Sequence, residues 1–231
     1  MLLACQEPDI IERWLRSRAT VRLAGLDLRP MPHPVVPGLP YRVTKGQGTV
    51  FFLEEYPHGT IWLLKKFAPS RRPSDVYLKA VTDYLPGGLQ FLTCSQRRIL
   101  RAKHMNRRRS QFKDEDLARY LSGTILMPKV PGISWSCLAD SLRNGEVAMT
   151  LVQRLQLALN LVTCVEALEK AGWQPPGLFR IHVNATRKGR LYLIDGDSLY
   201  HPQLPFQPNT TAGTPGYMAG FLRNTAGNWN G

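Results

Sequence analysis

The stretch TVFFLEEYPHGTIWLLK, residues 49–65, contains the clearest structural signal in the chain. β-Branched and aromatic residues are concentrated in 49–54 and again in 60–65, and these residue types are enriched in strands. Tyr56-Pro-His-Gly59 between them supplies residues that favour a turn. The stretch therefore predicts a β-hairpin, with Lys65 at the end of its second strand.

Two segments of different character precede the hairpin. Residues 7–18 place apolar side chains at helical spacing and predict a short helix. Five prolines between residues 29 and 41 exclude a helix there, because proline lacks an amide hydrogen and clashes with the preceding turn. We expect this part to be a rigid, extended lead-in, so that residues 1–40 form an N-terminal extension.

The remainder of the chain mixes helices with short strands. Ser74-Asp75 predicts the start of a helix over 74–84, and residues 125–130 predict a strand that runs into a loop. Two further short strands are expected near 180–184 and 190–195. The clearest helix is predicted over 146–170, with apolar side chains at helical spacing at Leu151, Leu155, Ala158, Val162, Val165 and Leu168. This order predicts an α+β protein with two unequal lobes around a cleft.

Composition narrows the class of protein. Of the 231 residues, 43% are hydrophobic and 20% are charged, which excludes wholesale disorder. No window holds 18 consecutive apolar residues, so we expect no membrane span. Four cysteines at wide, irregular spacings indicate neither a zinc site nor a disulfide framework. We therefore expect a reducing compartment: the cytoplasm, or the host-cell cytosol if the protein is a secreted effector.

The chain is strongly basic, with 30 Lys and Arg against 17 Asp and Glu and a net charge of +13, which favours an anionic partner. Two interpretations of its densest basic run stay open: a solvated helix face, or a surface for an acidic protein or a nucleic acid. Without an RNA-binding aromatic signature, a dedicated nucleic-acid module is the weaker form of the second. The run comprises Arg97, Arg98, Arg101, Lys103, Arg107, Arg108 and Arg109.

A glycine turn and a lysine suggest a phosphate site. Gly46-Gln-Gly48 leads into the strand that contains Val50, and glycines let backbone amides approach phosphate oxygens. Lys65 follows Val50 by fifteen residues, and its ammonium could hold α- and β-phosphates. A plain hairpin turn and a solvated lysine are the structural alternatives, and Lys66 competes with Lys65 for the role.

An amide and a carboxylate suggest a metal site. Asn184 and Asp195 fall at adjacent ends of the last two predicted strands. Their oxygen atoms are hard ligands of the kind that suits Mg²⁺. The structural alternative is that Asp195-Gly-Asp197 is simply a turn.

Taken in chain order, six segments resemble the protein-kinase superfamily, specifically an atypical, shortened, bacterial-type Ser/Thr protein-kinase-like domain. They are similar to the glycine-rich loop, the lysine strand, the hinge with Met127 as gatekeeper, the helix before the catalytic loop, the pair of metal ligands and the end of the activation loop. In the same order, the six segments are Gly46–Val50, Leu63–Phe67, Leu126–Gly132, Val165–Gly172, Asn184 with Asp195, and Gly213–Ala219.

The resemblance implies a two-lobed fold that binds ATP and Mg²⁺ between its lobes. Residues 41–130 would form a β-rich small lobe and 131–231 a truncated, mainly helical large lobe. Lys65 and Asp195 would have catalytic roles, Asn184 and Asp195 would hold the metal, and Thr211 and Thr214 are phosphosite candidates. The nucleotide would contact Gly46, Gly48, Val50, Lys65, Met127, Lys129 and Val130.

The chain also departs from the family's pattern. Phe179 occupies the position of the catalytic Asp, and the 74–84 helix has no Glu to pair with Lys65. Phosphoryl transfer depends mostly on positioning and charge neutralisation, so the loss of that Asp need not abolish turnover, although it removes the group that orients the substrate hydroxyl. The sequence favours a pseudokinase and leaves open a weak Ser/Thr phosphotransferase. The alternative is a basic adaptor that keeps the fold and binds an acidic protein or nucleic acid without nucleotide.

Overall fold

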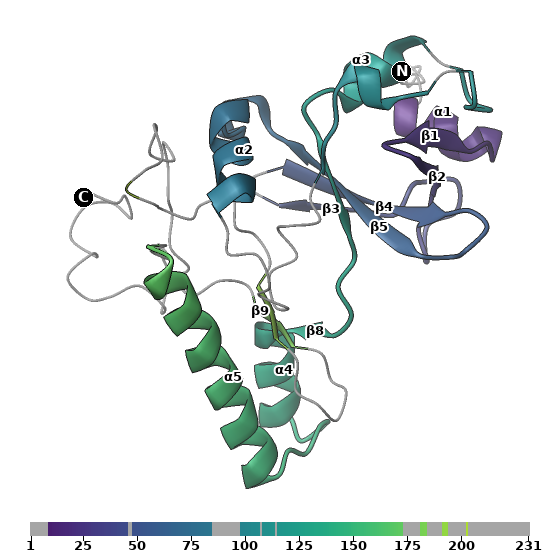
Figure 1. The fold of residues 1–231 in the computed structure, drawn as a ribbon. Coiled ribbons are helices and arrows are strands. Elements are labelled where there is room, and N and C mark those ends of the chain that lie inside the picture. The colour runs from purple at the N-terminus through teal and green to yellow at the C-terminus, as the bar shows by residue number, and fades with distance from the viewer. Residues whose placement is uncertain are drawn as a thin grey trace. The chain divides into compact units, whose positions relative to one another are not determined.

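The computed structural model describes residues 9–45, 48–84, 98–106, 108–113, 115–172, 181–183, 191–193 and 202. The chain divides into two compact units (Figure 1). The first comprises Met1–Arg72 and Arg97–Lys129, and the second comprises Pro73–Gln96 and Val130–Gly231. Both helices and antiparallel sheets are present, so the predicted α+β class is confirmed.

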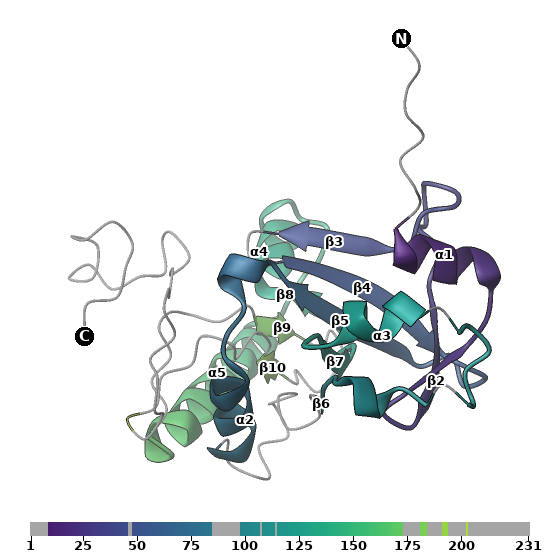
Figure 2. The ribbon, with the colours of Figure 1, turned by 90° about the horizontal axis from the view of Figure 1, so that it is seen from above.

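The first unit is built on a seven-stranded antiparallel sheet. Its strands follow the order β1-β2-β4-β5-β7-β6, and β3 pairs with β4 off this path. Figure 2 shows β3, β4 and β5 as neighbouring strands. The strands are β1 (Val21–Leu23), β2 (Leu26–Pro30), β3 (Arg42–Lys45), β4 (Gly48–Glu55), β5 (Ile61–Phe67), β6 (Arg98–Ile99) and β7 (Ile125–Pro128).

The hairpin predicted from residues 49–65 is confirmed as β4 and β5. Its turn is closed by the Glu55 N–H, which donates to the Thr60 carbonyl at 2.8 Å, and by the Gly59 N–H, which donates to the Glu55 carbonyl at 2.7 Å. β7, predicted within 125–130, pairs with β5 on the side away from β4. The strand that holds Lys65 is therefore an interior strand of the sheet.

The hydrophobic core of the first unit lies against one face of this sheet. Phe51, Leu64 and Leu126 stand opposite one another in register on β4, β5 and β7 and point to that face. Helix α1 (Ile10–Ser17) and helix α3 (Glu115–Leu121) add further apolar side chains to the same cluster. Trp14 of α1 is fully buried, and its indole N–H donates to the Ala19 carbonyl at 2.9 Å. The helix predicted at 7–18 is thus confirmed over the residues that are described.

The proline-rich segment between β2 and β3 is not helical, as predicted, but it is not extended either. Pro32 and Pro40 form a β-bridge, and the Tyr41 N–H donates to the Met31 carbonyl at 2.7 Å. The segment is therefore a loop whose two ends pair. The prediction of an extended lead-in was wrong because the prolines restrict the local backbone without setting the direction of the chain.

The second unit contains three helices and a small sheet among its described residues. The helices are α2 (Asp75–Tyr84), α4 (Trp135–Arg143) and α5 (Leu151–Lys170). The sheet follows the order β10-β9-β8, with β8 at Ile133–Ser134, β9 at Ile181–Val183 and β10 at Leu191–Leu193. The helix predicted at 74–84 and the two late strands are confirmed, and the Ser74 hydroxyl accepts from the Tyr77 N–H at 3.1 Å as an N-cap.

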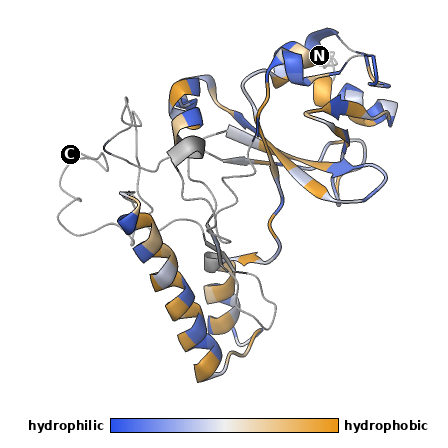
Figure 3. Cartoon of the chain, viewed as in Figure 1, coloured by the Kyte–Doolittle hydropathy of each residue, from blue (hydrophilic) through white to orange (hydrophobic). Residues whose placement is uncertain are grey.

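Helix α5 begins later than predicted, and of the predicted apolar positions only Leu168 is among those that the described structure buries. Thr150 and Gln153 form a capping box that starts the helix at Leu151 rather than at residue 146. The described core positions are Leu157, Cys164 and Leu168, whereas Leu155 is 61% exposed. Apolar residues at 157, 161, 164 and 168 also have helical spacing, so the sequence contains two overlapping stripes. Figure 3 shows apolar residues spread widely over α5.

Among the described residues, α5 alone is long and apolar enough to cross a membrane by length and composition. The core helix of a soluble protein passes the same test, so this is weak evidence. It does not contradict the expectation that the chain has no membrane span.

Candidate functional site

Lys65 lies on the sheet face opposite to the hydrophobic core. It stands in register between Val50 on β4 and Ile125 on β7. Directly opposed residues of antiparallel strands project to the same side, so these three side chains share a face. Leu63, two residues before Lys65, is paired with Met127 and adds a second row to that face. We call it the Lys65 face: Val50, Phe52, Leu63, Lys65, Ile125 and Met127.

The Lys65 side chain is buried, with 5% of its surface exposed. Its ammonium nitrogen lies 4.9 Å from the centroid of the Phe67 ring, which is within range of a cation–π contact. A buried cation in a row of apolar side chains is a candidate for binding an anionic group next to an apolar one.

Lys66 has a different environment because it projects to the core side of the sheet. Its ammonium nitrogen lies 3.0 Å from the centroid of the Tyr120 ring on α3. Burial lowers the pKa of Lys66, while the charge of Asp9 acts in the opposite direction. The pKa of Tyr120 is raised, first by burial and then by Asp9. Strand alternation thus removes Lys66 from the Lys65 face and gives it a packing role.

Gly48 is required by the contact between β4 and β5. Its φ is +151°, and a Cβ at this position would lie 2.1 Å from the Lys66 carbonyl oxygen and 2.8 Å from the Phe67 Cα. Strand packing therefore explains this glycine without any ligand. Gly46, the other glycine of the predicted phosphate turn, lies outside the described residues.

The predicted hinge, Leu126–Gly132, begins within β7 and continues beyond its last residue, Pro128. Pro128 has no N–H, and the Lys129 N–H donates to the Ile61 carbonyl at 2.9 Å. The Lys129 amide therefore serves the sheet rather than a ligand. Val130, the next residue, is buried and belongs to the second unit.

An aromatic stack at the Lys65 face was missed in the sequence. Phe52 pairs with Leu63, and its ring stacks on Tyr41 with centroids 4.0 Å apart and planes at 10°. The Lys129 ammonium lies 5.9 Å from the Phe52 ring centroid. Alternation along β4 carried the signal, because Phe52 is two residues after Val50 and must share its face.

Several predicted site residues lie outside the described residues, so the structure neither brings them together nor separates them. The strands β9 and β10 that flank Asn184 and Asp195 pair as an antiparallel hairpin, with Leu191 opposite Val183. In the part of the chain that is described, no group of three or more His, Cys, Asp or Glu side chains could hold a metal. The residues outside are Gly46, Arg97, Arg107, Phe179, Asn184, Asp195, Thr211 and Thr214.

The basic run does not form an α-helix over its described residues, so the helix in the first interpretation was wrong, whereas the exposure of its side chains agrees with a solvated surface. It contains β6, a 3₁₀ turn at Ala102–His104 and a turn at residues 108–109. Hydrogen bonds to residues 20–24 compete successfully with helix formation here. The basic side chains that the structure describes are all exposed: Arg98, Arg101, Lys103, Arg108 and Arg109.

The Lys65 face brings together apolar side chains, of which Ile125 is buried, and one buried lysine. This combination of chemical groups suits a ligand that has a flat apolar part and an anionic part. No protein-family model matches this chain, and no curated protein matches it significantly in sequence.

Proposed function

We propose that this chain is a protein-kinase-like domain that binds ATP with Mg²⁺, either as a pseudokinase or as a weak Ser/Thr phosphotransferase. One observation carries the proposal: Lys65 is buried on an interior strand and shares a face with Val50 and Met127. These are the three described residues for which the kinase resemblance requires a common face.

The order of the strands supports the proposal. In protein kinases a glycine-rich loop covers the phosphates and the essential lysine stands on the third strand. Here β3 and β4 flank the glycine turn, and Lys65 is on β5, the next strand along the chain. The strand that leads to the predicted hinge, β7, pairs with β5.

The chemistry of the face also supports a nucleotide. Val50, Leu63 and Met127 offer apolar contacts of the kind that a purine ring requires, and the Lys65 ammonium offers a charge for phosphate oxygens. Asn184 and Asp195 would supply oxygen ligands for Mg²⁺. The buried position of Lys65 strengthens its interaction with an anion, because the effective dielectric constant is lower than in water.

The resemblance lacks a chemical group that catalysis needs. Phe179, at the position of the catalytic base, cannot accept a proton or orient a substrate hydroxyl. Nucleotide binding does not need that group. We therefore expect binding to be retained and turnover to be absent or slow.

The test is a thermal-shift titration with ATP, with and without Mg²⁺, on the full chain. Ligand at about 100 times its Kd stabilises a protein by about 2.7 kcal/mol. At about 2–4 °C per kcal/mol, this raises the Tm by roughly 5–11 °C. We expect this rise in wild type, only with Mg²⁺, and its loss in Lys65→Met and Asp195→Ala.

Lys66→Met is the matched control, because it removes the neighbouring lysine from the opposite face. Its starting Tm should fall through the lost contact with Tyr120, yet its ATP-dependent rise should equal that of wild type. Circular dichroism would establish that Lys65→Met is folded, and Lys65→Arg provides a milder second variant. A rise that survives in both Lys65 variants would contradict the proposed site. Absence of any rise in wild type would favour the adaptor alternative.

A further inference from the structure

The basic segment that follows β6 is fixed along the free edge of β1. The Ala24 N–H donates to the His104 carbonyl at 2.8 Å, and the Gln111 N–H donates to the Thr20 carbonyl at 2.9 Å. Between these two bonds, Leu23 and Met105 form a β-bridge. Residues 104–111 therefore run beside residues 20–24, held at both ends.

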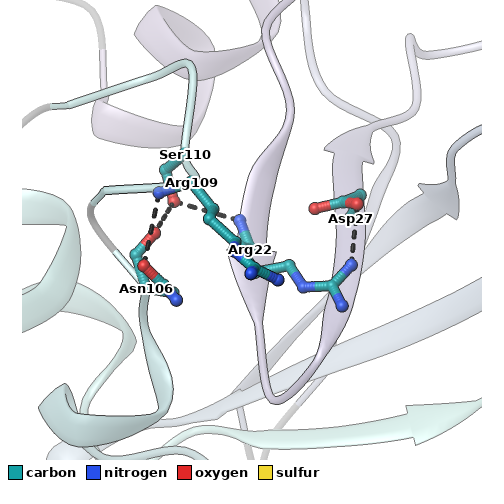
Figure 4. A network of polar contacts seen from close by, with 5 residues as sticks. All are labelled: Arg22, Asp27, Asn106, Arg109 and Ser110. Atoms are coloured by element: carbon teal, nitrogen blue, oxygen red, sulfur yellow. Dashed lines mark hydrogen bonds and ion pairs between the residues drawn. The ribbon is translucent and has the colours of Figure 1, made fainter.

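A turn stabilised by its own side chains lies in the middle of this segment (Figure 4). The Arg109 N–H donates to both the main-chain and the side-chain oxygen of Asn106, each at 3.2 Å. The Ser110 hydroxyl donates to the Asn106 carbonyl at 2.7 Å and accepts from the Arg22 N–H at 3.1 Å. Ser110 is 3% exposed. The backbone that carries Arg108 and Arg109 is thus organised before any partner arrives.

The charge on this segment is of one sign. Residues 97–113 contain eight Lys and Arg and no Asp or Glu. Two nearby arginines have internal roles: Arg22 pairs with Asp27 at 2.7 Å, and the Arg98 guanidinium donates to the Ala24 carbonyl and lies 5.9 Å from the Trp62 ring centroid. Four exposed cations have no ion pair with any residue that the structure describes. These residues, Lys103, Arg108, Arg109 and Lys113, are called the cationic strip.

The cationic strip has no apolar anchor. In the described parts of 98–113 no large apolar side chain is exposed: Leu100 and Met105 are buried, and Phe112 packs against the core cluster. Binding hot spots of protein interfaces and membrane-surface helices both depend on exposed aromatic or aliphatic side chains. Single-stranded nucleic acid is bound through stacking on exposed aromatic rings, which this segment also lacks.

We propose that the cationic strip binds the phosphodiester backbone of double-stranded nucleic acid, without reading its sequence. A fixed backbone with arginines and lysines, and with nothing for apolar or stacking contact, suits a regular array of phosphates. Arginine also presents a planar fork that matches phosphate oxygens. This activity is separate from nucleotide binding at Lys65.

The salt dependence of binding measures the number of phosphates neutralised. Four cations predict a slope of log Kobs against log salt of about −3.6, because each neutralised phosphate contributes about −0.9 for DNA. The measurement is fluorescence anisotropy of the full chain with a labelled 24-base-pair DNA duplex, and with an RNA duplex of equal length, across a range of NaCl concentrations. The triple variant Lys103→Gln, Arg108→Gln, Arg109→Gln should make the slope less steep by about 2.7 and weaken binding at least tenfold.

The matched control removes the same charge from exposed sites on α4 and α5: Arg143→Gln, Arg154→Gln and Lys170→Gln. It should leave the slope within about half a unit of wild type. Equal losses in the two triple variants would overturn the proposal, because the effect would then be one of net charge. Binding to polyglutamate, to phosphatidylserine vesicles or to a single strand as tightly as to the duplex would also overturn it.

Discussion

Replacing Gly48 by alanine tests whether the packing of β4 against β5 requires this glycine, independently of any role in binding phosphate. The added Cβ would lie 2.1 Å from the Lys66 carbonyl oxygen. An ordinary contact between carbon and a carbonyl oxygen is about 3.3 Å, so β4 and β5 would have to move apart by about 1.2 Å at this point. Forcing extra atoms into a packed region costs about 1–3 kcal/mol, beyond the cost of placing alanine at a φ of +151°.

Gly38→Ala is the matched control for the backbone. Gly38 also has a positive φ, +80°, but nothing lies within 4 Å of its Cβ position. It therefore bears the conformational cost of alanine without the contact. At about 2–4 °C per kcal/mol, Gly48→Ala should melt roughly 2–12 °C below Gly38→Ala in a thermal unfolding scan without nucleotide. Equal melting temperatures would refute the close approach of β4 to β5 on which the geometry of the Lys65 face rests.

Two further predictions concern groups whose protonation is altered by the fold. Burial and Asp9 raise the pKa of Tyr120 in the folded chain. The unfolded chain therefore loses the phenol proton near the ordinary pKa of 10.0, while the folded chain keeps it, and the free energy of unfolding should fall as the pH rises above 10. Tyr120→Phe should make that fall shallower in urea titrations. Identical pH slopes would contradict the buried phenol. Burial raises the pKa of Cys164 to about 11, whereas Cys137 is exposed, so iodoacetamide at pH 8 should alkylate Cys137 first. Peptide mass spectrometry measures the two rates, and equal rates would count against the packing of α5.

Sequence patterns predicted those helices and strands that are specified by neighbouring residues alone. The hairpin of β4 and β5, helices α1 and α2 and the strand β7 all follow from strand propensity, turn residues or caps. The sequence did not predict β1 and β2. β1 has only three residues, with Arg22 at its centre, and in β2 Asp27 stands between two leucines. Such short alternations of charged and apolar residues cannot be distinguished from a loop. These strands form because α1 and the 104–111 segment pack beside them.

The orientation of the candidate site depended on tertiary structure. Val50, Phe51, Phe52 and Leu53 are all apolar, so alternation along β4 does not reveal which face contacts the core. The adjacent lysines 65 and 66 present the same ambiguity. Packing of α1 and α3 against Phe51 decides it, since it assigns Lys66 to the core side and Lys65 to the opposite face. A sequence pattern can propose a lysine at this strand, but only the non-local packing chooses between the two.

The cationic strip and the Lys65 face can be tested separately, and the separation matters because ATP is itself a polyanion. Lys65 is on β5, whereas Lys103, Arg108 and Arg109 follow β6 and none of them belongs to the Lys65 face. Removing the charges at these three positions should leave the ATP-dependent thermal shift unchanged. Mg²⁺ gives a second distinction: it neutralises part of the charge on ATP and should weaken binding to the cationic strip, whereas a site with Asn184 and Asp195 as metal ligands should bind better with Mg²⁺. An ATP shift that Mg²⁺ reduces, and that the triple variant abolishes, would place the nucleotide on the strip and remove the basis for a kinase-like site.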